Sequence, residues 1–313
     1  MNLYVRRDYK TITEALTSAN PGDAIIIPSG VYKEKIYIEK PDISLIGDGH
    51  VTITYDGASG KPDNAGGVYG TFTSATVTVL ESAINFKAEN IIFENSYNRT
   101  DPERSVTQAV ALSCGADGSA FYDCSILGWQ DTLYLHGGGM QFFHECYIEG
   151  SVDFIFGDAR VLFEDCDINC VRSSSYITAA NTSENSAAGL VFYHCYISAC
   201  EGCESIFLGR PWHAERDGVN SATAFIECTY NCDIAPVGWL PWHLEPGTEG
   251  SNTRYLEYNN SDAYGSQAYT AERAIWSKQL TRDEAEELMT YIGKAAKYPN
   301  EEEHEHHEHN HNA

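Results

Sequence analysis

The sequence predicts an all-β protein of the solenoid type, a β-helix, from one repeat and the composition of its surroundings. The pattern Phe-x-x-Cys-x-[Ile/Tyr] occurs five times, and its cysteines are spaced by 22, 20, 29 and 33 residues. Short runs rich in Val, Ile, Tyr and Phe, separated by Gly, Asp and Asn, are typical of strands. Repeats of this length indicate a solenoid, propeller or array, and no copy has room for two helices. We therefore expect one coil per repeat, with loops of variable length on one flank.

The repeat cysteines are expected to be small buried residues that stack from coil to coil, rather than disulfides or metal ligands. They are Cys124, Cys146, Cys166, Cys195 and Cys228. The segment Phe93-Glu94-Asn95-Ser96 resembles an earlier copy with serine in place of cysteine. The pair Cys200-x-x-Cys203 lies outside the repeat, and a disulfide or a weak metal site there remains open.

Two helices are expected to cap the solenoid, because its terminal coils would otherwise expose the core. A capping-box pattern opens a short helix from Thr11 to about Ala19, and another opens a helix from Thr281 to about Gly293. The sequence thus predicts a single domain over residues 1–298. The Glu/His-rich tail, residues 299–313, is expected to be disordered and solvated rather than metal-binding.

The charge and the hydropathy pattern limit the partners. The formal net charge of the 313 residues is −25, which argues against nucleic acid as a partner because phosphates need Lys and Arg. Apolar runs stay far below the roughly 18 residues that cross a membrane, so no membrane association is expected. We expect a monomer. Arg6, Arg7 and Asp8 leave no apolar signal core, which predicts a cytoplasmic protein, or an extracellular one if a leader has been removed.

Two aspartates are expected to stack on consecutive coils. Asp131 follows Cys124 by seven residues, and Asp153 follows Cys146 by seven. Neighbouring strands lie about 4.7–4.9 Å apart, and at that distance one carboxyl pKa should rise while the other falls. Such a pair supplies one acid and one anionic nucleophile or base. Two unrelated surface aspartates are the plainer interpretation, but both lie in apolar surroundings, where a charge needs a reason.

The residues around this pair resemble the signature blocks of pectin methylesterases. The blocks run in order through most of the chain, and four of them together are highly specific. They are Gln108-Ala109-Val110-Ala111-Leu112, Gln130-Asp131-Thr132-Leu133-Tyr134, Val152-Asp153-Phe154-Ile155-Phe156-Gly157 and Leu208-Gly209-Arg210-Pro211-Trp212, and Tyr69-Gly70-Thr71-Phe72 resembles a substrate-binding segment. The resemblance implies a right-handed, single-stranded parallel β-helix. It also implies an esterase without metal or cofactor that releases methanol from methyl-esterified galacturonate in pectin.

The resemblance further implies a role for each site residue. Asp153 is the expected nucleophile, and Asp131 the general acid that then acts as base. Gln108 and Gln130 are expected to donate to the oxyanion, although adjacent residues share one site only if the chain bends between Gln130 and Asp131. The remaining candidates are Arg210, expected to pair with Asp153, and the substrate-binding residues Thr71, Phe156, Arg172, Asn181, Trp212 and Trp239.

Two rival functions remain. A retaining glycoside hydrolase, such as a galacturonase, also uses two carboxyl groups about 5–5.5 Å apart, but it does not need two amide donors beside them. A non-catalytic pectin-binding module would not need both aspartates and Arg210. A serine esterase is disfavoured because no Gly-x-Ser-x-Gly elbow occurs. The product would separate the two classes of enzyme: a methylesterase releases methanol, and a glycoside hydrolase creates new reducing ends.

Overall fold

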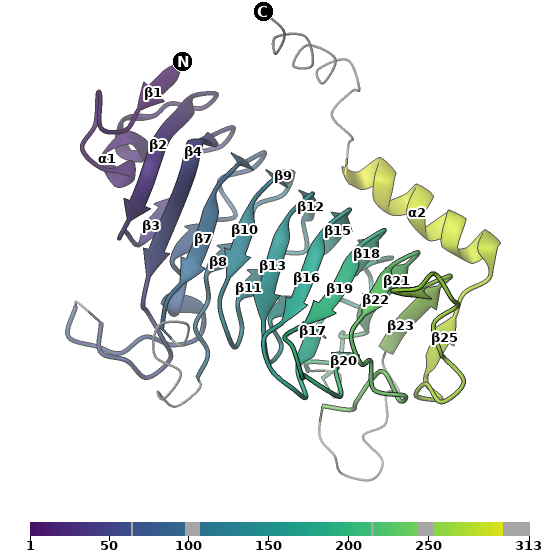
Figure 1. Ribbon diagram of the computed structural model, residues 1–313. Coiled ribbons are helices and arrows are strands. Elements are labelled where there is room, and N and C mark those ends of the chain that lie inside the picture. Colours follow the sequence, from purple (N-terminus) through teal and green to yellow (C-terminus); the bar gives the residue numbers. More distant parts are fainter. Residues whose placement is uncertain (64, 98–106, 214–215, 243–252, 297–313) are drawn as a thin grey trace, which may run out of the picture.

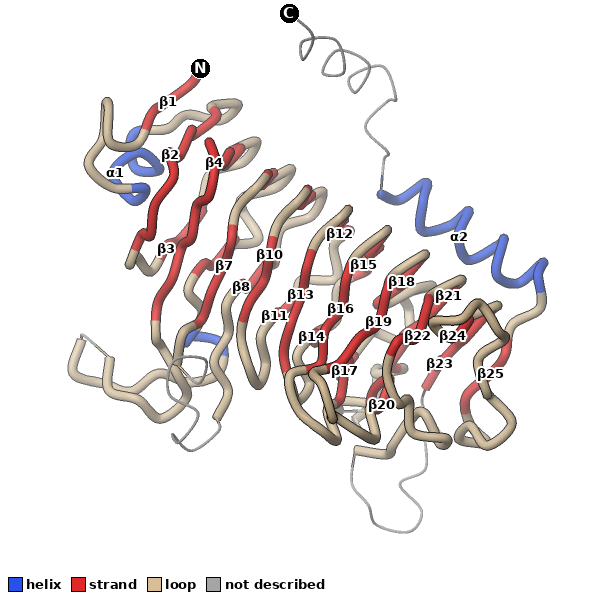
Figure 2. Tube along the Cα trace, viewed as in Figure 1, coloured by secondary structure: helices blue, strands red, loops and turns tan. Residues whose placement is uncertain are grey.

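The chain winds into a right-handed parallel β-helix, which confirms the predicted fold (Figure 1). The computed structural model describes residues 1–63, 65–97, 107–213, 216–242 and 253–296. Strands of successive coils pair in parallel and build three long faces (Figure 2). The helices are short and peripheral. The fold is therefore stabilised by strand pairing between coils and by the apolar core enclosed by the three faces.

The strand bounds define the three faces. Face 1 contains β1 (Asn2–Tyr4), β2 (Ala24–Tyr32), β4 (Ser44–Tyr55), β6 (Lys87–Glu89), β9 (Ser119–Tyr122), β12 (Met140–His144), β15 (Arg160–Glu164), β18 (Leu190–Tyr193), β21 (Ser221–Ile226), β23 (Thr253–Tyr258) and β25 (Ser277–Gln279). Face 2 continues from the second half of β4 through β7 (Ile92–Asn95), β10 (Ser125–Leu127), β13 (Tyr147–Gly150), β16 (Asp167–Cys170), β19 (Tyr196–Ala199), β22 (Thr229–Asn231) and β24 (Ser261–Asp262). Face 3 contains β3 (Ile36–Ile38), β5 (Val77–Val79), β8 (Leu112–Cys114), β11 (Leu133–Leu135), β14 (Ile155–Gly157), β17 (Tyr176–Ala180) and β20 (Phe207–Gly209).

The aromatic position of the repeat forms a continuous stack through the core. Its ring centroids are 4.4, 5.0, 4.5 and 4.5 Å apart along the series Phe121, Phe143, Phe163, Phe192 and Phe225. Each of these residues pairs in register with its neighbour on the next coil. The repeat read from the sequence is therefore the structural coil.

The cysteine position behaves as predicted. The five repeat cysteines are buried and their thiols are free. The Cys146 thiol donates to the carbonyl oxygen of Phe121, one coil earlier, at 3.5 Å. Cys200 and Cys203 form a disulfide, which settles the question that their spacing left open.

One supposed copy of the repeat is out of register. Phe93 pairs with Ile126, so it occupies the isoleucine position, and Ala88 is the residue opposite Phe121. The likeness of Phe93-Glu94-Asn95-Ser96 to the pattern is thus accidental. A phenylalanine in the isoleucine column fits because alanine stands where the other coils have phenylalanine.

Both predicted helices exist, but only one closes an end of the solenoid. Helix α1 (Ile12–Ser18) covers the N-terminal coil, and the Thr11 side chain accepts a bond from the Glu14 amide. Helix α2 (Arg282–Ala296) runs beyond Gly293 and lies along face 1 over β12 and β15 (Figure 1). Ile292 is buried there among outward-facing apolar side chains of that face. The helix therefore covers a side of the solenoid. No helix within the described ranges is long and apolar enough to cross a membrane.

Candidate active site

A pocket of about 270 Å³ opens on face 3 and collects most of the predicted site residues. Eight of its lining residues were expected from the sequence, namely Thr71, Gln108, Gln130, Asp131, Asp153, Phe156, Arg210 and Trp212. Phe72, Ala179 and Trp242 complete the lining. Residues from seven stretches of the chain thus converge on one concave surface.

The coil register places the two aspartates opposite each other. Ser125 pairs with Tyr147 before the aspartates, and Leu133 pairs with Ile155 after them, so the offset of 22 residues is constant across the turn. The Asp131 amide donates to the Val152 carbonyl oxygen at 3.0 Å. The two carboxyl groups therefore belong to adjacent coils, where backbones lie about 4.8 Å apart.

The chain bends at both aspartates, as the adjacency of Gln130 and Asp131 required. Asp131 has φ of 59° and Asp153 has φ of 51°, both in the left-handed region. Non-glycine residues adopt this conformation rarely, and a side chain turned by it no longer alternates as in a strand. Gln130 and Asp131 consequently line the same pocket.

Arg210 holds Asp153 in a two-pronged ion pair. Its Nε donates to Oδ1 at 2.8 Å and its Nη2 donates to Oδ2 at 2.6 Å. The guanidinium lies between two rings, 4.3 Å from the Tyr176 centroid and 4.5 Å from the Trp242 centroid. Charge-assisted, bidentate bonds of this kind fix both position and orientation, so the Asp153 carboxylate cannot rotate freely.

Burial and neighbouring charges give the two carboxyl groups unequal proton affinities. Burial raises the pKa of Asp131 well above its usual range, and the charge of Asp153 raises it further. Burial also raises the pKa of Asp153, while the hydrogen bonds and charge of Arg210 lower it. The fall that we expected in the pKa of Asp153 is absent, because the effect of burial is larger than the opposing effect of Arg210. The order of the two groups is nevertheless the expected one, with Asp131 holding its proton to higher pH.

The two glutamines lie on adjacent coils beside this pair. Gln108 and Gln130 form a parallel bridge, and the Ala109 amide donates to the Gln130 carbonyl oxygen at 3.1 Å. The Thr107 hydroxyl donates to Gln108 Oε1 at 3.1 Å. The amide NH₂ is the part of the Gln108 side chain that can donate to an incoming acceptor.

Aromatic side chains form the walls of the pocket. Phe72 lies 4.8 Å from Tyr134 and 6.3 Å from Trp212, measured between ring centroids. Phe156 stacks on Tyr134 at 4.8 Å and meets Trp212 edge-on at 5.7 Å. Apolar ring faces beside polar catalytic groups suit a sugar, whose C–H faces are apolar and whose rim is polar.

Two glycines of the signature blocks are required by close backbone approach. At Gly157, φ is 127° and a Cβ would lie 1.8 Å from the Leu135 carbonyl oxygen; at Gly209 it would lie 2.1 Å from the Thr178 hydroxyl. Any side chain at either position would push apart the coils that carry the site.

Three predicted substrate-binding residues do not line the pocket. Trp239 is fully buried, stacks on Tyr255 at 4.3 Å and donates to Glu257, so it is a core residue and that prediction was wrong. Arg172 is exposed and donates to the carbonyl oxygen of Ser173. Asn181 follows β17, and its side-chain oxygen is buried with no hydrogen-bond partner among the residues that the structure describes.

Sequence reasoning missed Phe72, Tyr176 and Trp242. Phe72 stood inside the Tyr69–Phe72 block and could have been named. Trp242 lies three residues beyond Trp239, in a stretch where nothing in the sequence tells a buried tryptophan from an exposed one. Tyr176 became visible only through the pairing of β17 with β20, which places it opposite Phe207 and below Arg210.

A parallel β-helix whose pocket holds two buried aspartates, a bidentate arginine and two glutamines has the architecture of a carbohydrate esterase. Within the described part of the chain, no group of three or more His, Cys, Asp and Glu side chains is arranged to hold a metal ion. Residues 4–296 match the Pectinesterase family, and the chain belongs to that family.

Relatives and solved structures agree with this assignment. Pectinesterase 31 of Arabidopsis thaliana is 36% identical over 296 residues, which cover 89% of this chain and 86% of that protein. Pectinesterase/pectinesterase inhibitor 3 of Arabidopsis thaliana is longer, and the match covers 44% of it. The pectin methylesterase from carrot superposes with a TM-score of 0.79 at 33% identity, covering 95% of this chain and 96% of that one. A pectin methylesterase in complex with hexasaccharide VII gives a TM-score of 0.77 at 29% identity, covering 93% of each chain.

Proposed function

We propose that this protein hydrolyses the methyl esters of galacturonate residues in pectin, with Asp153 as nucleophile and Asp131 as general acid and base. The observation that supports this assignment of roles is the bidentate contact of Arg210 with Asp153 alone. Arg210 favours the anionic form of the carboxyl with which it pairs and fixes its orientation, whereas Asp131, which has no such ion pair among the described residues, holds its proton to higher pH. One group can therefore attack while the other protonates a leaving group.

In the first half-reaction the Asp153 carboxylate attacks the ester carbonyl carbon. Negative charge develops on the carbonyl oxygen, where the amide N–H groups of Gln108 and Gln130 donate. When the intermediate collapses, the C–O bond to the methoxy group breaks and the Asp131 proton passes to it. Methanol leaves, and the galacturonyl group is joined to Asp153 as an anhydride.

In the second half-reaction the Asp131 carboxylate takes a proton from water, and the resulting hydroxide attacks the galacturonyl carbonyl. The bond to Asp153 breaks, which restores its carboxylate and frees the galacturonate. Asp131 again carries its proton. One water is consumed and one methanol and one carboxylic acid are produced, so the residues return to their starting states.

The substrate is proposed to be the esterified polymer rather than a small ester. A relative crystallised with a hexasaccharide is a pectin methylesterase, and the pocket here has aromatic walls and stays open to solvent along face 3. Trp212 and Phe72 would hold the sugar ring by apolar contact.

We further propose that residues 1–298 act as a monomer, since both aspartates, both glutamines and Arg210 lie within this one stretch of the chain. Removal of residues 299–313 should leave methanol release unchanged, and light scattering should report a single copy.

The product identifies the reaction class. Highly esterified pectin should yield methanol at a rate proportional to enzyme, with no new reducing ends. New reducing ends would indicate a glycoside hydrolase, and neither product would indicate a binding module.

A further inference from the structure

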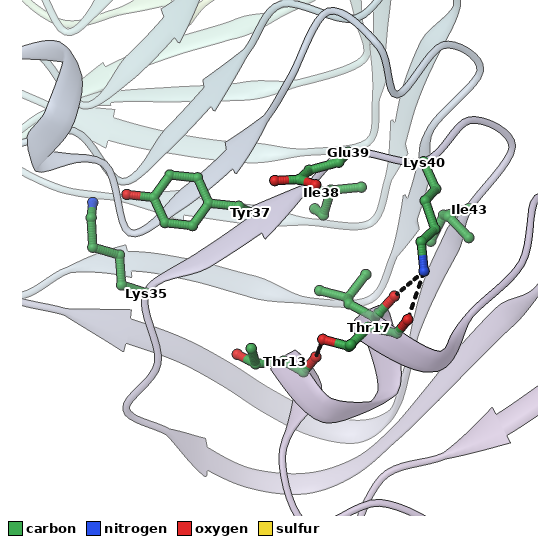
Figure 3. Close-up of a pocket in the computed structure, with 9 residues that line it drawn as sticks. Thr13, Thr17, Lys35, Tyr37, Ile38, Glu39, Lys40 and Ile43 are labelled. Atoms are coloured by element: carbon green, nitrogen blue, oxygen red, sulfur yellow. Dashed lines mark hydrogen bonds between the residues drawn. The ribbon is translucent and has the colours of Figure 1, made fainter.

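A second groove lies at the N-terminal end of face 3, between α1 and β3. Figure 3 shows Lys35 at one end of this groove of about 310 Å³ and Lys40 at the other. Lys40 Nζ donates to the carbonyl oxygens of Leu16, Thr17 and Ala19 at 3.1, 2.7 and 2.7 Å. Lys40 thus closes the end of α1, which is a purely structural task.

Lys35 has a different set of neighbours. Its Nζ lies 5.6, 5.9 and 5.3 Å from the ring centroids of Tyr37, Tyr55 and Tyr69. It also donates a hydrogen bond to the carbonyl oxygen of Ala75. A partly buried ammonium near three rings is held by cation–π attraction and by the Ala75 carbonyl.

Ala75 ends the turn that carries one wall of the candidate active site. The 3-10 turn η1 (Phe72–Ser74) begins after Thr71, and both Thr71 and Phe72 line the pocket. The Ser74 hydroxyl donates to the Thr71 carbonyl oxygen at 2.6 Å and accepts from the Val110 amide at 3.0 Å. The turn is thus tied on one side to the coil of Gln108 and on the other to Lys35.

We propose that Lys35 is a positioning residue for pectin binding, because its ammonium holds the Thr71–Ala75 turn, and with it one wall of the substrate cleft, against the end of face 3. This inference rests on the proposed function. Phe72 is about half exposed and reaches over Tyr134, so a turn released at Ala75 would let that ring move away from the sugar. The loss should appear in KM, since Asp131 and Asp153 lie on other coils.

The protonation of the Lys35 amine makes its hold on the Thr71–Ala75 turn depend on pH. Burial lowers the pKa of Lys35 to about 8. Two of the tyrosines facing it stay neutral in this range: the pKa of Tyr69 is raised to about 12, first by its bond with Tyr55, and burial raises the pKa of Tyr37. The ammonium is therefore present below pH 8 and is lost as the pH rises through that value.

Three acidic residues lie beyond the rings or along the groove. Asp56, next to Tyr55 in the chain, pairs with Lys61 at 2.5 Å. Asp63 contributes a negative charge near Tyr69, and Glu39, the residue after β3, lines the same groove (Figure 3). Burial causes the shift in the pKa of Lys35, so the rings and the Ala75 carbonyl are the contacts to test.

The experiment compares methanol release and substrate binding in Lys35→Met, Lys35→Arg and Lys40→Met. We expect Lys35→Met to raise KM roughly threefold to tenfold with kcat changed less than about twofold, the pattern of a lost binding interaction. Lys40→Met should lower Tm and leave KM at the parental value. In the parent, KM should rise between about pH 7 and 9; in Lys35→Met it should be high and flat, and in Lys35→Arg low and flat.

Binding of methyl-esterified oligogalacturonide, followed by tryptophan fluorescence, separates this inference from the proposed function. A parent that binds oligosaccharide without releasing methanol contradicts the proposed function but still allows Lys35 to be judged by affinity. An unchanged KM and affinity in Lys35→Met, with a fall in Tm like that of Lys40→Met, would show a structural role only. If Lys35→Met does not fold, a parental pH profile of KM identical to that of Lys35→Arg overturns the proposal. A blank without enzyme corrects for alkaline ester hydrolysis.

Discussion

Arg210 is the residue whose removal should change the pH dependence of the enzyme most. Arg210→Ala deletes two charge-assisted hydrogen bonds to Asp153, of 2.8 and 2.6 Å. Each such bond contributes about 1.5–3 kcal/mol. Water entering the vacated space replaces part of this, so we take one bond's worth, about 1.5–3 kcal/mol, as the net loss. That corresponds to a loss of activity of about 10-fold to 150-fold.

The sign follows from which state of Asp153 the arginine favours. Arg210 lowers the pKa of a carboxyl that burial has raised, so removing the arginine lets Asp153 take up a proton at higher pH. The protonated group cannot attack. Methanol release by Arg210→Ala should therefore climb about tenfold per pH unit over a range in which the parent is flat.

The assay is initial-rate methanol release on highly esterified pectin between pH 4 and 8, with Arg210→Lys as the matched variant. Lysine keeps the charge but not the planar fork, so its profile should lie close to the parent's in shape at a lower level. A profile of Arg210→Ala that is lower than the parent's but parallel to it would refute the reasoning, since the arginine would then act on something other than Asp153 ionisation.

Three further outcomes follow from the site, the core and the charge. Activity should be unaffected by EDTA, and a loss of about tenfold restored by Ca²⁺ or Zn²⁺ would mean that the site has been misread. A thiol reagent should modify few cysteines in the native protein and eight in the unfolded protein, since only Cys200 and Cys203 are paired. Cys146→Leu should overpack the stack of repeat cysteines and lower the unfolding free energy by about 1–3 kcal/mol. At −25 the enzyme should prefer neutral, highly esterified pectin at low salt, leave scattered rather than blocked free carboxylates, and lose that preference as salt shortens the Debye length below about 8–10 Å.

The register of the site was predictable because the repeat and the site share one coil. A cysteine spacing of 22 residues between Cys124 and Cys146 carries over unchanged to Asp131 and Asp153, with no insertion between them. The same argument failed for Phe93, because a resemblance over four residues did not predict that Phe93 pairs with Ile126.

The wall residues were harder to predict, because they depend on loops rather than on the repeat. Trp239 and Trp242 stand three residues apart, and one is core while the other covers Arg210. Only the bridge of Trp239 to Gly209 decides between them. Lys35 is similar: its function depends on Tyr55 and Tyr69, which come near it only when the coils stack.

A bend at Asp131 could be expected from its adjacency to Gln130, but the left-handed conformation that produces the bend could not. Residues with positive φ precede each repeat cysteine as well, with φ between 49° and 54° at Asp123, Glu145, Asp165, His194 and Glu227. Their side chains differ in charge and size, so composition does not mark the position. What they share is the turn between faces 1 and 2, a property of the coil.

The division of labour between Asp153 and Asp131 is the central claim, and methanol release by their variants tests it most directly. Asp153→Ala removes the nucleophile and should reduce release to background. Asp131→Asn keeps the shape but cannot donate the proton, and should lose about 10²–10⁴-fold with a smaller change in affinity. If Asp153→Ala retained a third or more of the parental rate while Asp131→Ala was inactive, the nucleophile would lie on the other coil; activity in both would contradict the paired site altogether.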